Sequence, residues 1–176
     1  VWLPQETILF DGARLQRSWR ADLAADSALL AAETWTLGRT AMGESVRSGG
    51  LIDAWEIYRE GQLLWADRFR YDSDLDGDLQ KWIAQPAVLD GNITMMTMVV
   101  VCPDVDAVLS TVRDALELDC VTAGASKIGP LMLLRAVAAN PVRLRGALIR
   151  VLDHLQSVPS AVPALDGFVL PRVFDC

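Results

Sequence analysis

The stretch ITMMTMVVVCPDVDAVLSTVRDALEL, residues 93–118, contains the change of pattern that decides the fold. Ile93 to Cys102 is an apolar run without a charge, which is typical of a buried strand. After Pro103 the apolar residues recur every three or four positions, which is the period of a helix. Asp104 is placed to cap that helix. We therefore predict that the chain changes from strands to helices at Pro103.

Upstream of this stretch the pattern is that of strands. The dipeptide Glu60-Gly61 is a hairpin signal between two strand-like segments. In the second arm of that hairpin alternate residues share a face, as a half-buried strand requires. Those residues are Leu63, Trp65, Phe69 and Tyr71. The expected strands cover Thr7–Phe10, Leu29–Leu37, Leu51–Arg59 and Gln62–Tyr71.

Downstream of it we expect one further strand and a second helix. Pro130–Ala138 has the composition of a strand. Asn140-Pro141 combines a capping side chain with proline at the first helical position, and an apolar stripe follows. The sequence thus predicts a mainly β chain with two late α-helices, near Asp104–Leu118 and Pro141–Gln156.

Composition limits the classes of partner. The 176 residues suffice for one domain. The net charge of −7 argues against nucleic acid, whose binding proteins are normally basic. Hydrophobic residues make up 52% and the mean hydropathy is +0.25, which suggests apolar surface reserved for a partner protein. No uncharged apolar run approaches the ~20 residues of a membrane span, and we expect no membrane partner.

The cysteines indicate the compartment. Cys102, Cys120 and Cys176 are an odd number with wide spacing, which favours a reducing environment over a disulfide framework. Because no signal peptide is recognisable at Val1, we expect a cytoplasmic protein. The chain opens without Met, and we interpret it as a fragment of a longer protein.

Catalytic patterns are poorly matched. The single histidine, His154, lies inside the second predicted helix, and Ser126 is one residue off the spacing of a nucleophile elbow, in what reads as a glycine-containing turn. The cysteines and His154 lack the spacing of a zinc site. The segment Gly38–Glu44 lacks the lysine of a phosphate-binding loop. We therefore predict no catalytic residue and no enzyme.

The sharpest local metal pattern is acidic. Asp72, Asp74 and Asp76, followed by Gly77, match the opening of a calcium loop. The twelfth position, which should be a bidentate glutamate, is Ile83. Two interpretations follow: a stand-alone protein that binds calcium through these aspartates, or a solvated acidic turn between strands.

Two blocks of sequence resemble one family. Leu3–Leu15 (LPQETILFDGARL) and Leu37–Glu44 (LGRTAMGE) are similar to the urease accessory protein UreD, also called UreH. Ala123–Ser126 resembles a late block of that family, and Leu170–Phe174 resembles its terminal motif, with Phe174 where tryptophan is common. The resemblance covers essentially residues 1–176 as a single UreD-like domain. The resemblance implies further strands before Leu3, and we expect that this sequence lacks them.

The resemblance implies a scaffold or chaperone for urease maturation and not an enzyme. Its fold would be a layered, β-helix-like arrangement of strands. Its partners would be UreF-like and UreG-like accessory proteins and apo-urease, with nickel passing transiently and no tightly bound cofactor. Arg39, Gly43 and Glu44 would lie in a tight turn that is either partner-binding or a structural bend with a surface ion pair.

Overall fold

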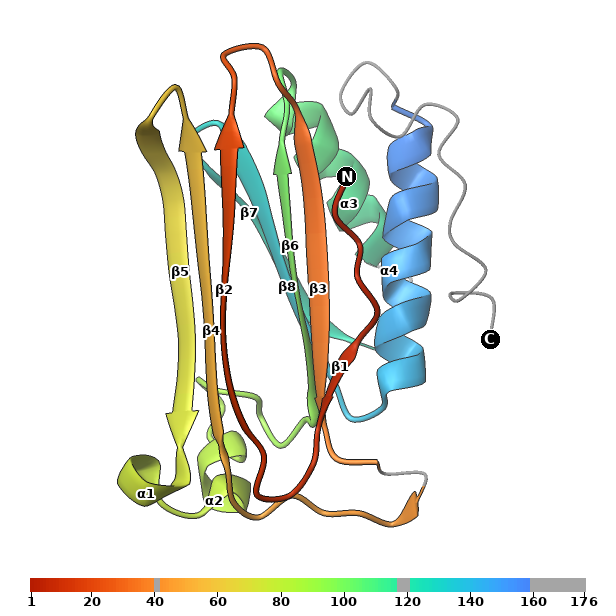
Figure 1. Ribbon diagram of the computed structural model, residues 1–176. Coiled ribbons are helices and arrows are strands. Elements are labelled where there is room, and N and C mark those ends of the chain that lie inside the picture. The colour runs from red at the N-terminus through yellow and green to blue at the C-terminus, as the bar shows by residue number, and fades with distance from the viewer. Residues whose placement is uncertain (40–41, 117–120, 159–176) are drawn as a thin grey trace. The chain divides into compact units, whose positions relative to one another are not determined.

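The computed structural model describes residues 1–39, 42–116 and 121–158 (Figure 1). The chain divides into two compact units that alternate along the sequence. The first unit comprises residues 1–6, 27–34 and those from 94 onward, and the second comprises residues 7–26 and 35–93. Strands predominate, and the two long helices both follow Pro103, so the predicted fold class is confirmed.

The first unit is built on an antiparallel arrangement of late strands. β6 (Thr94–Val101) pairs with β8 (Leu131–Ala138), and β8 pairs with β7 (Thr122–Ile128). β3 (Leu29–Leu37) is the other neighbour of β6. All eight residues of β6 are buried, as expected for a central strand with both faces covered. This burial explains the uninterrupted apolar run that the sequence shows there.

Two helices cover one face of these strands. α3 (Val105–Leu116) and α4 (Pro141–Gln156) lie side by side in Figure 1. Their predicted caps are confirmed: the Ala107 amide donates to Asp104 Oδ1 at 3.0 Å, and the Val142 amide donates to Asn140 Oδ1 at 2.8 Å. The predicted end of the first helix, Leu118, lies outside the described residues. No helix in the described part of the chain combines the length and apolar character needed to cross a membrane.

The second unit contains a three-stranded mixed sheet. β4 (Gly50–Arg59) is central, parallel to β2 (Arg14–Leu23) and antiparallel to β5 (Gln62–Asp72). Glu60 and Gly61 join β4 to β5 with φ of 50° and 75°, the backbone of a tight two-residue hairpin, which confirms the predicted turn. The short β1 (Thr7–Leu9) pairs in parallel with Trp35–Leu37 at the end of β3.

Indole rings pack the inner face of this sheet. Trp55 is 2% exposed, and its ring centroid lies 4.9 Å from that of Trp19 and 6.2 Å from that of Trp65. These rings come from three neighbouring strands. Their contacts therefore hold β2, β4 and β5 in register from one side.

Three local expectations are corrected. The acidic segment after Tyr71 is not a simple turn between strands: it contains the short helix α1 (Ser73–Asp76), capped by Asp72, and leads into a second short helix, α2 (Leu79–Ile83), capped by Asp78. Ser126 lies on strand β7 and not in a turn, because pairing with β8 supplies the hydrogen bonds that its small residues would not favour alone. β2 was not predicted, although its exposure alternates strictly, because Arg17 interrupts its apolar face.

The fourth correction concerns Leu63. It was placed on the buried face of β5, yet it is 54% exposed. Ile57 lies opposite Trp65 while Tyr58 lies opposite Leu63, so Leu64 is an extra residue in a bulge. An extra residue shifts the alternation beyond it by one position. The β-helix-like arrangement is also not confirmed, since the described strands form two mixed sheets.

Candidate functional site

The turn predicted around Arg39, Gly43 and Glu44 lies between β3 and β4. Arg39 Nε donates to Glu44 Oε2 at 3.1 Å, and the backbone amide of Arg39 donates to the same oxygen at 3.1 Å. The glutamate side chain is 20% exposed and that of the arginine 54%. The structure therefore brings the two predicted residues together as an ion pair that closes the turn.

Glu44 also joins this turn to a distant segment. Its other oxygen, Oε1, accepts from the backbone amide of Asp11 at 3.3 Å. In return, the Asp11 carboxylate accepts from the amides of Arg47 and Ser48 at 2.8 and 2.9 Å. We call this reciprocal pair of carboxylates the Asp11–Glu44 clasp. It fastens the turn after β1 to the loop before β4.

The clasp depends on ionised carboxylates. The backbone amide of Arg39, with its side chain, lowers the pKa of Glu44 below its ordinary value. The amides of Arg47 and Ser48 likewise lower the pKa of Asp11. Hydrogen bonds donated to a carboxylate favour its charged form, which is the physical cause of both shifts. The two acids are therefore held ionised where they cross-link the loops.

Glycines shape the loop on either side of the clasp. Gly43 has φ of +73°, a conformation that side chains with a Cβ disfavour, although no atom would crowd a Cβ there. Gly49 has φ of +139°, and a Cβ there would overlap the backbone oxygen of Ala13. Gly43 is thus required by backbone conformation, whereas Gly49 also permits close approach of β2 and β4.

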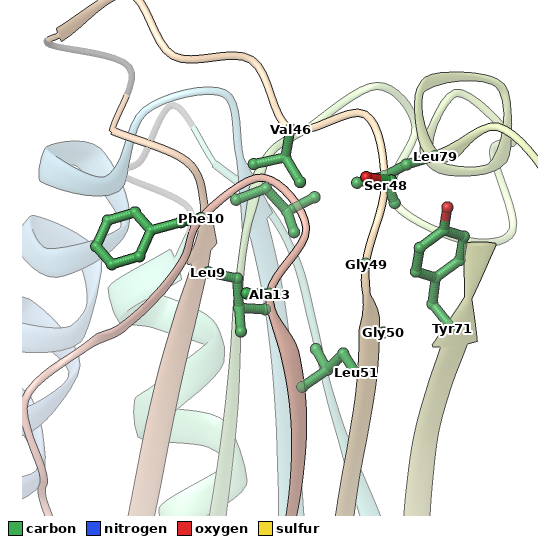
Figure 2. Close-up of a pocket in the computed structure, with 11 residues that line it drawn as sticks. Leu9, Phe10, Ala13, Val46, Ser48, Gly49, Gly50, Leu51, Tyr71 and Leu79 are labelled. Carbon is green, nitrogen blue, oxygen red and sulfur yellow. The ribbon is translucent and has the colours of Figure 1, made fainter. Parts of the chain in front are cut away.

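A small apolar cavity lies behind the two loops (Figure 2). Its volume is about 20 Å³, roughly enough for one water molecule and far below the ~300 Å³ of a typical small-molecule pocket. The side chains around it are mostly apolar and come from both loops and the neighbouring strands. They include Leu9, Ala13, Val46, Leu51, Tyr71 and Leu79. The loops therefore offer an outer surface for binding rather than an enclosed substrate site.

The three aspartates that were candidate metal ligands form ion pairs with arginines. Arg14 forms ion pairs with both Asp72 and Asp74, and Arg70 Nη1 lies 3.0 Å from Asp76 Oδ2. Asp72 also caps α1, and Asp76 Oδ2 accepts from the Asp72 amide at 2.7 Å. A calcium ion would have to displace these partners. Over residues 1–39, 42–116 and 121–158, no three His, Cys, Asp or Glu side chains gather in a way that could hold a metal ion.

The remaining sequence candidates lie in the first unit. His154 is on α4, where its Nδ1 is 2.9 Å from the backbone oxygen of Arg150. Ser126 is exposed on β7. Cys102 is buried, and burial raises the pKa of its thiol. Cys120, Cys176 and the terminal block up to Phe174 lie outside the described residues. Within the ranges that the structure describes, the His154 ring bonds to the backbone of its own helix and not to a nucleophile of the kind that a triad needs.

Sequence reasoning missed Asp11 and Phe10. The Asp11 carboxylate makes three hydrogen bonds to the 47–48 segment. Phe10 lies under the Arg39 guanidinium, whose central carbon is 4.6 Å from the ring centroid. Their position inside the Leu3–Leu15 block was the one signal in the sequence that could have marked them as functional. Their contacts could not be predicted, because their partners lie about thirty residues away along the chain.

Comparison with known proteins identifies relatives over almost the entire chain. The sequence model of the UreD urease accessory protein family matches residues 1–167. Urease accessory protein UreD of Methylobacterium sp. (strain 4-46) is 40% identical over 179 residues, which cover 99% of this chain and 58% of the relative. The corresponding protein of Sinorhizobium medicae is 42% identical over 176 residues, covering 98% of this chain and 59% of the relative.

The chain spans little more than half the length of these relatives. The matched part includes both loops of the Asp11–Glu44 clasp and both long helices. On the extent of the family match and on identities of about 40%, the chain belongs to the UreD urease accessory protein family.

Proposed function

We propose that this chain serves as a scaffold in urease maturation, assembling with UreF-like and UreG-like accessory proteins on apo-urease to support nickel insertion. The observation that carries the proposal is the family match over residues 1–167. The members of that family are named as accessory proteins and not as enzymes. The chain would work in the reducing cytoplasm, as its cysteine pattern predicts.

The geometry favours a protein-binding role over a chemical one. The residues that the resemblance singled out, Arg39, Gly43 and Glu44, form a cross-linked surface turn with only a one-water cavity behind it. Side chains that are already held by hydrogen bonds, as Arg39 and Glu44 are, lose less conformational entropy when a partner binds. We propose that this turn belongs to the surface that meets the accessory partners.

Nickel would pass transiently and without a resident cage. Imidazole and thiolate suit Ni²⁺ well, yet His154 lies on α4 and Cys102 is buried on a strand end. Carboxylates with water would hold the ion loosely and release it quickly. The stand-alone calcium alternative gains no support, because Arg14 and Arg70 occupy the aspartates on which it depends.

Co-expression tests the proposal. A tagged form of this chain is produced with UreF-like and UreG-like proteins and apo-urease, purified by its tag, and analysed for co-purifying proteins and for the nickel content of urease. We expect the accessory proteins to co-purify. The full-length Methylobacterium relative serves as the positive control. If that relative retains its partners while this chain retains none, the scaffold proposal for this chain is wrong.

A further inference from the structure

Large apolar side chains are exposed around the Asp11–Glu44 clasp. Met42 is 77% exposed, Phe10 45% and Ile8 40%. Ile8 and Phe10 are two residues apart along β1 and its continuation, so they lie on the same side of the strand. Figure 2 shows the Phe10 ring directed away from the side chains that surround the small cavity. These side chains therefore expose apolar surface to solvent and are not packed into the apolar interior of their unit.

Arg39 lies among them with part of its hydrogen-bonding capacity unused. Its guanidinium carbon lies 4.6 Å from the centroid of the Phe10 ring, and only Nε is bonded to Glu44. Neither Nη atom hydrogen-bonds to a residue in the described ranges. Met42 belongs to the same turn, since its amide donates to the Arg39 carbonyl oxygen at 2.8 Å. A guanidinium that lies over an aromatic ring and is hydrogen-bonded only through Nε can use its two Nη atoms to bind a carboxylate.

Hydrogen bonds to Glu44 hold Arg39 and the residue after Phe10 in place. Glu44 fixes both the backbone and the Nε of Arg39, and it also binds the amide that follows Phe10. Aromatic residues, methionine and arginine are enriched where proteins bind each other, and arginine is among the residues that contribute most to the binding energy. Exposed side chains of this type, gathered around the Asp11–Glu44 clasp, therefore indicate an interaction surface.

Local charge permits an anionic partner. The chain as a whole carries −7, but Arg39 and Arg47 balance Asp11 and Glu44 in these loops. An incoming carboxylate would meet no excess of negative charge here. A small acidic metabolite is disfavoured, because the cavity of about 20 Å³ behind the loops cannot enclose one. The ligand that matches this surface is therefore a carboxylate that belongs to a larger, apolar polypeptide segment.

We propose that Ile8, Phe10, Arg39 and Met42 form a docking surface for an acidic, apolar segment of a partner protein. A carboxylate of the segment accepts hydrogen bonds from the Nη atoms of Arg39, and neighbouring apolar side chains pack on Phe10 and Met42. The inference rests on the proposed function, because it assigns this surface to a partner within the maturation assembly.

Substitutions measured in the co-expressed complex test the surface. Phe10→Ala and Arg39→Gln should each weaken partner binding at least tenfold, and Arg39→Gln should also flatten its dependence on salt. Arg39→Lys should recover little, because an ammonium cannot form the bidentate pair. Leu75→Ala, at an apolar residue 75% exposed on α1, and Arg68→Ala, at an exposed arginine on β5, are matched controls that should bind as the unaltered chain does.

Oxidative footprinting of the unaltered chain supplies a test without substitutions. Met42 should oxidise readily in the free chain and should be protected at least fivefold in the complex. If partners co-purify but Met42 stays fully oxidisable and both variants bind normally, the docking surface is wrong while the scaffold proposal stands. If no partner co-purifies with the unaltered chain, the scaffold proposal itself fails. If Phe10→Ala instead abolishes self-association in sedimentation experiments, the occupant is a second copy, which overturns the partner segment.

Discussion

Removal of the Asp53 carboxylate should destabilise the second unit strongly. Asp53 on β4 lies opposite Arg17 on β2, and the two side chains form a bidentate pair with both N–O distances at 2.8 Å. The carboxylate side chain is 7% exposed and the arginine 22%. A third donor, Arg17 Nη1, binds Thr7 Oγ1 at 3.1 Å. The pair thus sits on the inner face of the sheet, next to the packed indole rings.

The expected cost of Asp53→Ala follows from this burial. Two unit charges about 4 Å apart attract by roughly 4 kcal/mol at an effective dielectric constant of 20. Breaking a buried pair by removing one partner typically costs about 3–5 kcal/mol, because the remaining charge loses its main compensating group. Since Arg17 keeps some contact with solvent, we discount this figure. We expect a loss of about 2–4 kcal/mol in the free energy of unfolding.

Urea denaturation of the 176-residue chain, followed by tryptophan fluorescence, measures this loss. The double variant Arg17→Met with Asp53→Leu should be markedly more stable than Asp53→Ala, because it leaves no uncompensated charge. Asp22→Ala is the control: Asp22 pairs with Arg20 on β2, both are more than half exposed, and the midpoint should not move. A loss below about 0.5 kcal/mol for Asp53→Ala, with an unchanged urea slope, would refute the reasoning.

Three further predictions concern the core, the clasp and the acidic segment. Leu152→Ala in α4, at a fully buried position, should cost about 2–5 kcal/mol in unfolding experiments, and full stability would contradict the helix packing. In the folded chain the pKa of Glu44 lies below its ordinary value of 4.5. Its stabilising effect is therefore complete above pH 4.5 and is lost as the pH falls through the lowered pKa of the folded chain. Acid unfolding of Glu44→Gln should therefore depend less steeply on pH below about 5, and an unchanged slope would exclude the clasp. Calcium at millimolar concentration should leave the urea midpoint unchanged, because arginines occupy Asp72, Asp74 and Asp76, and a raised midpoint would show that the aspartates rearrange around the ion.

Sequence alone predicted the elements whose determinants are local. The hairpin turn at Glu60-Gly61 depends on two residues that adopt positive φ. The helix Pro141–Gln156 was placed with its observed limits, because its cap, its proline and its apolar stripe lie within one segment. β3 likewise ends at Leu37, where Gly38 begins the turn. In each case interactions between neighbouring residues are strong enough to determine the local conformation.

The same holds for part of the candidate site. Arg39 and Glu44 were placed together in one turn, because they are five positions apart and the glycines around them favour a bend. The two blocks that resemble the UreD family also lie in continuous sequence, so the family could be inferred without coordinates. The family comparison then confirmed that inference.

Tertiary structure decided the features that depend on distant residues. β2 pairs with β4 and not with β3, the strand that follows it, and the bulge at Leu64 turns Leu63 outward. The Asp11–Glu44 clasp joins residues 33 apart, and Arg17 meets Asp53 across 36 residues. No local propensity encodes such pairings, since the gain appears only after the intervening chain has closed into a loop. The position of the exposed Phe10 ring beneath the Arg39 guanidinium therefore had to be read from the folded chain.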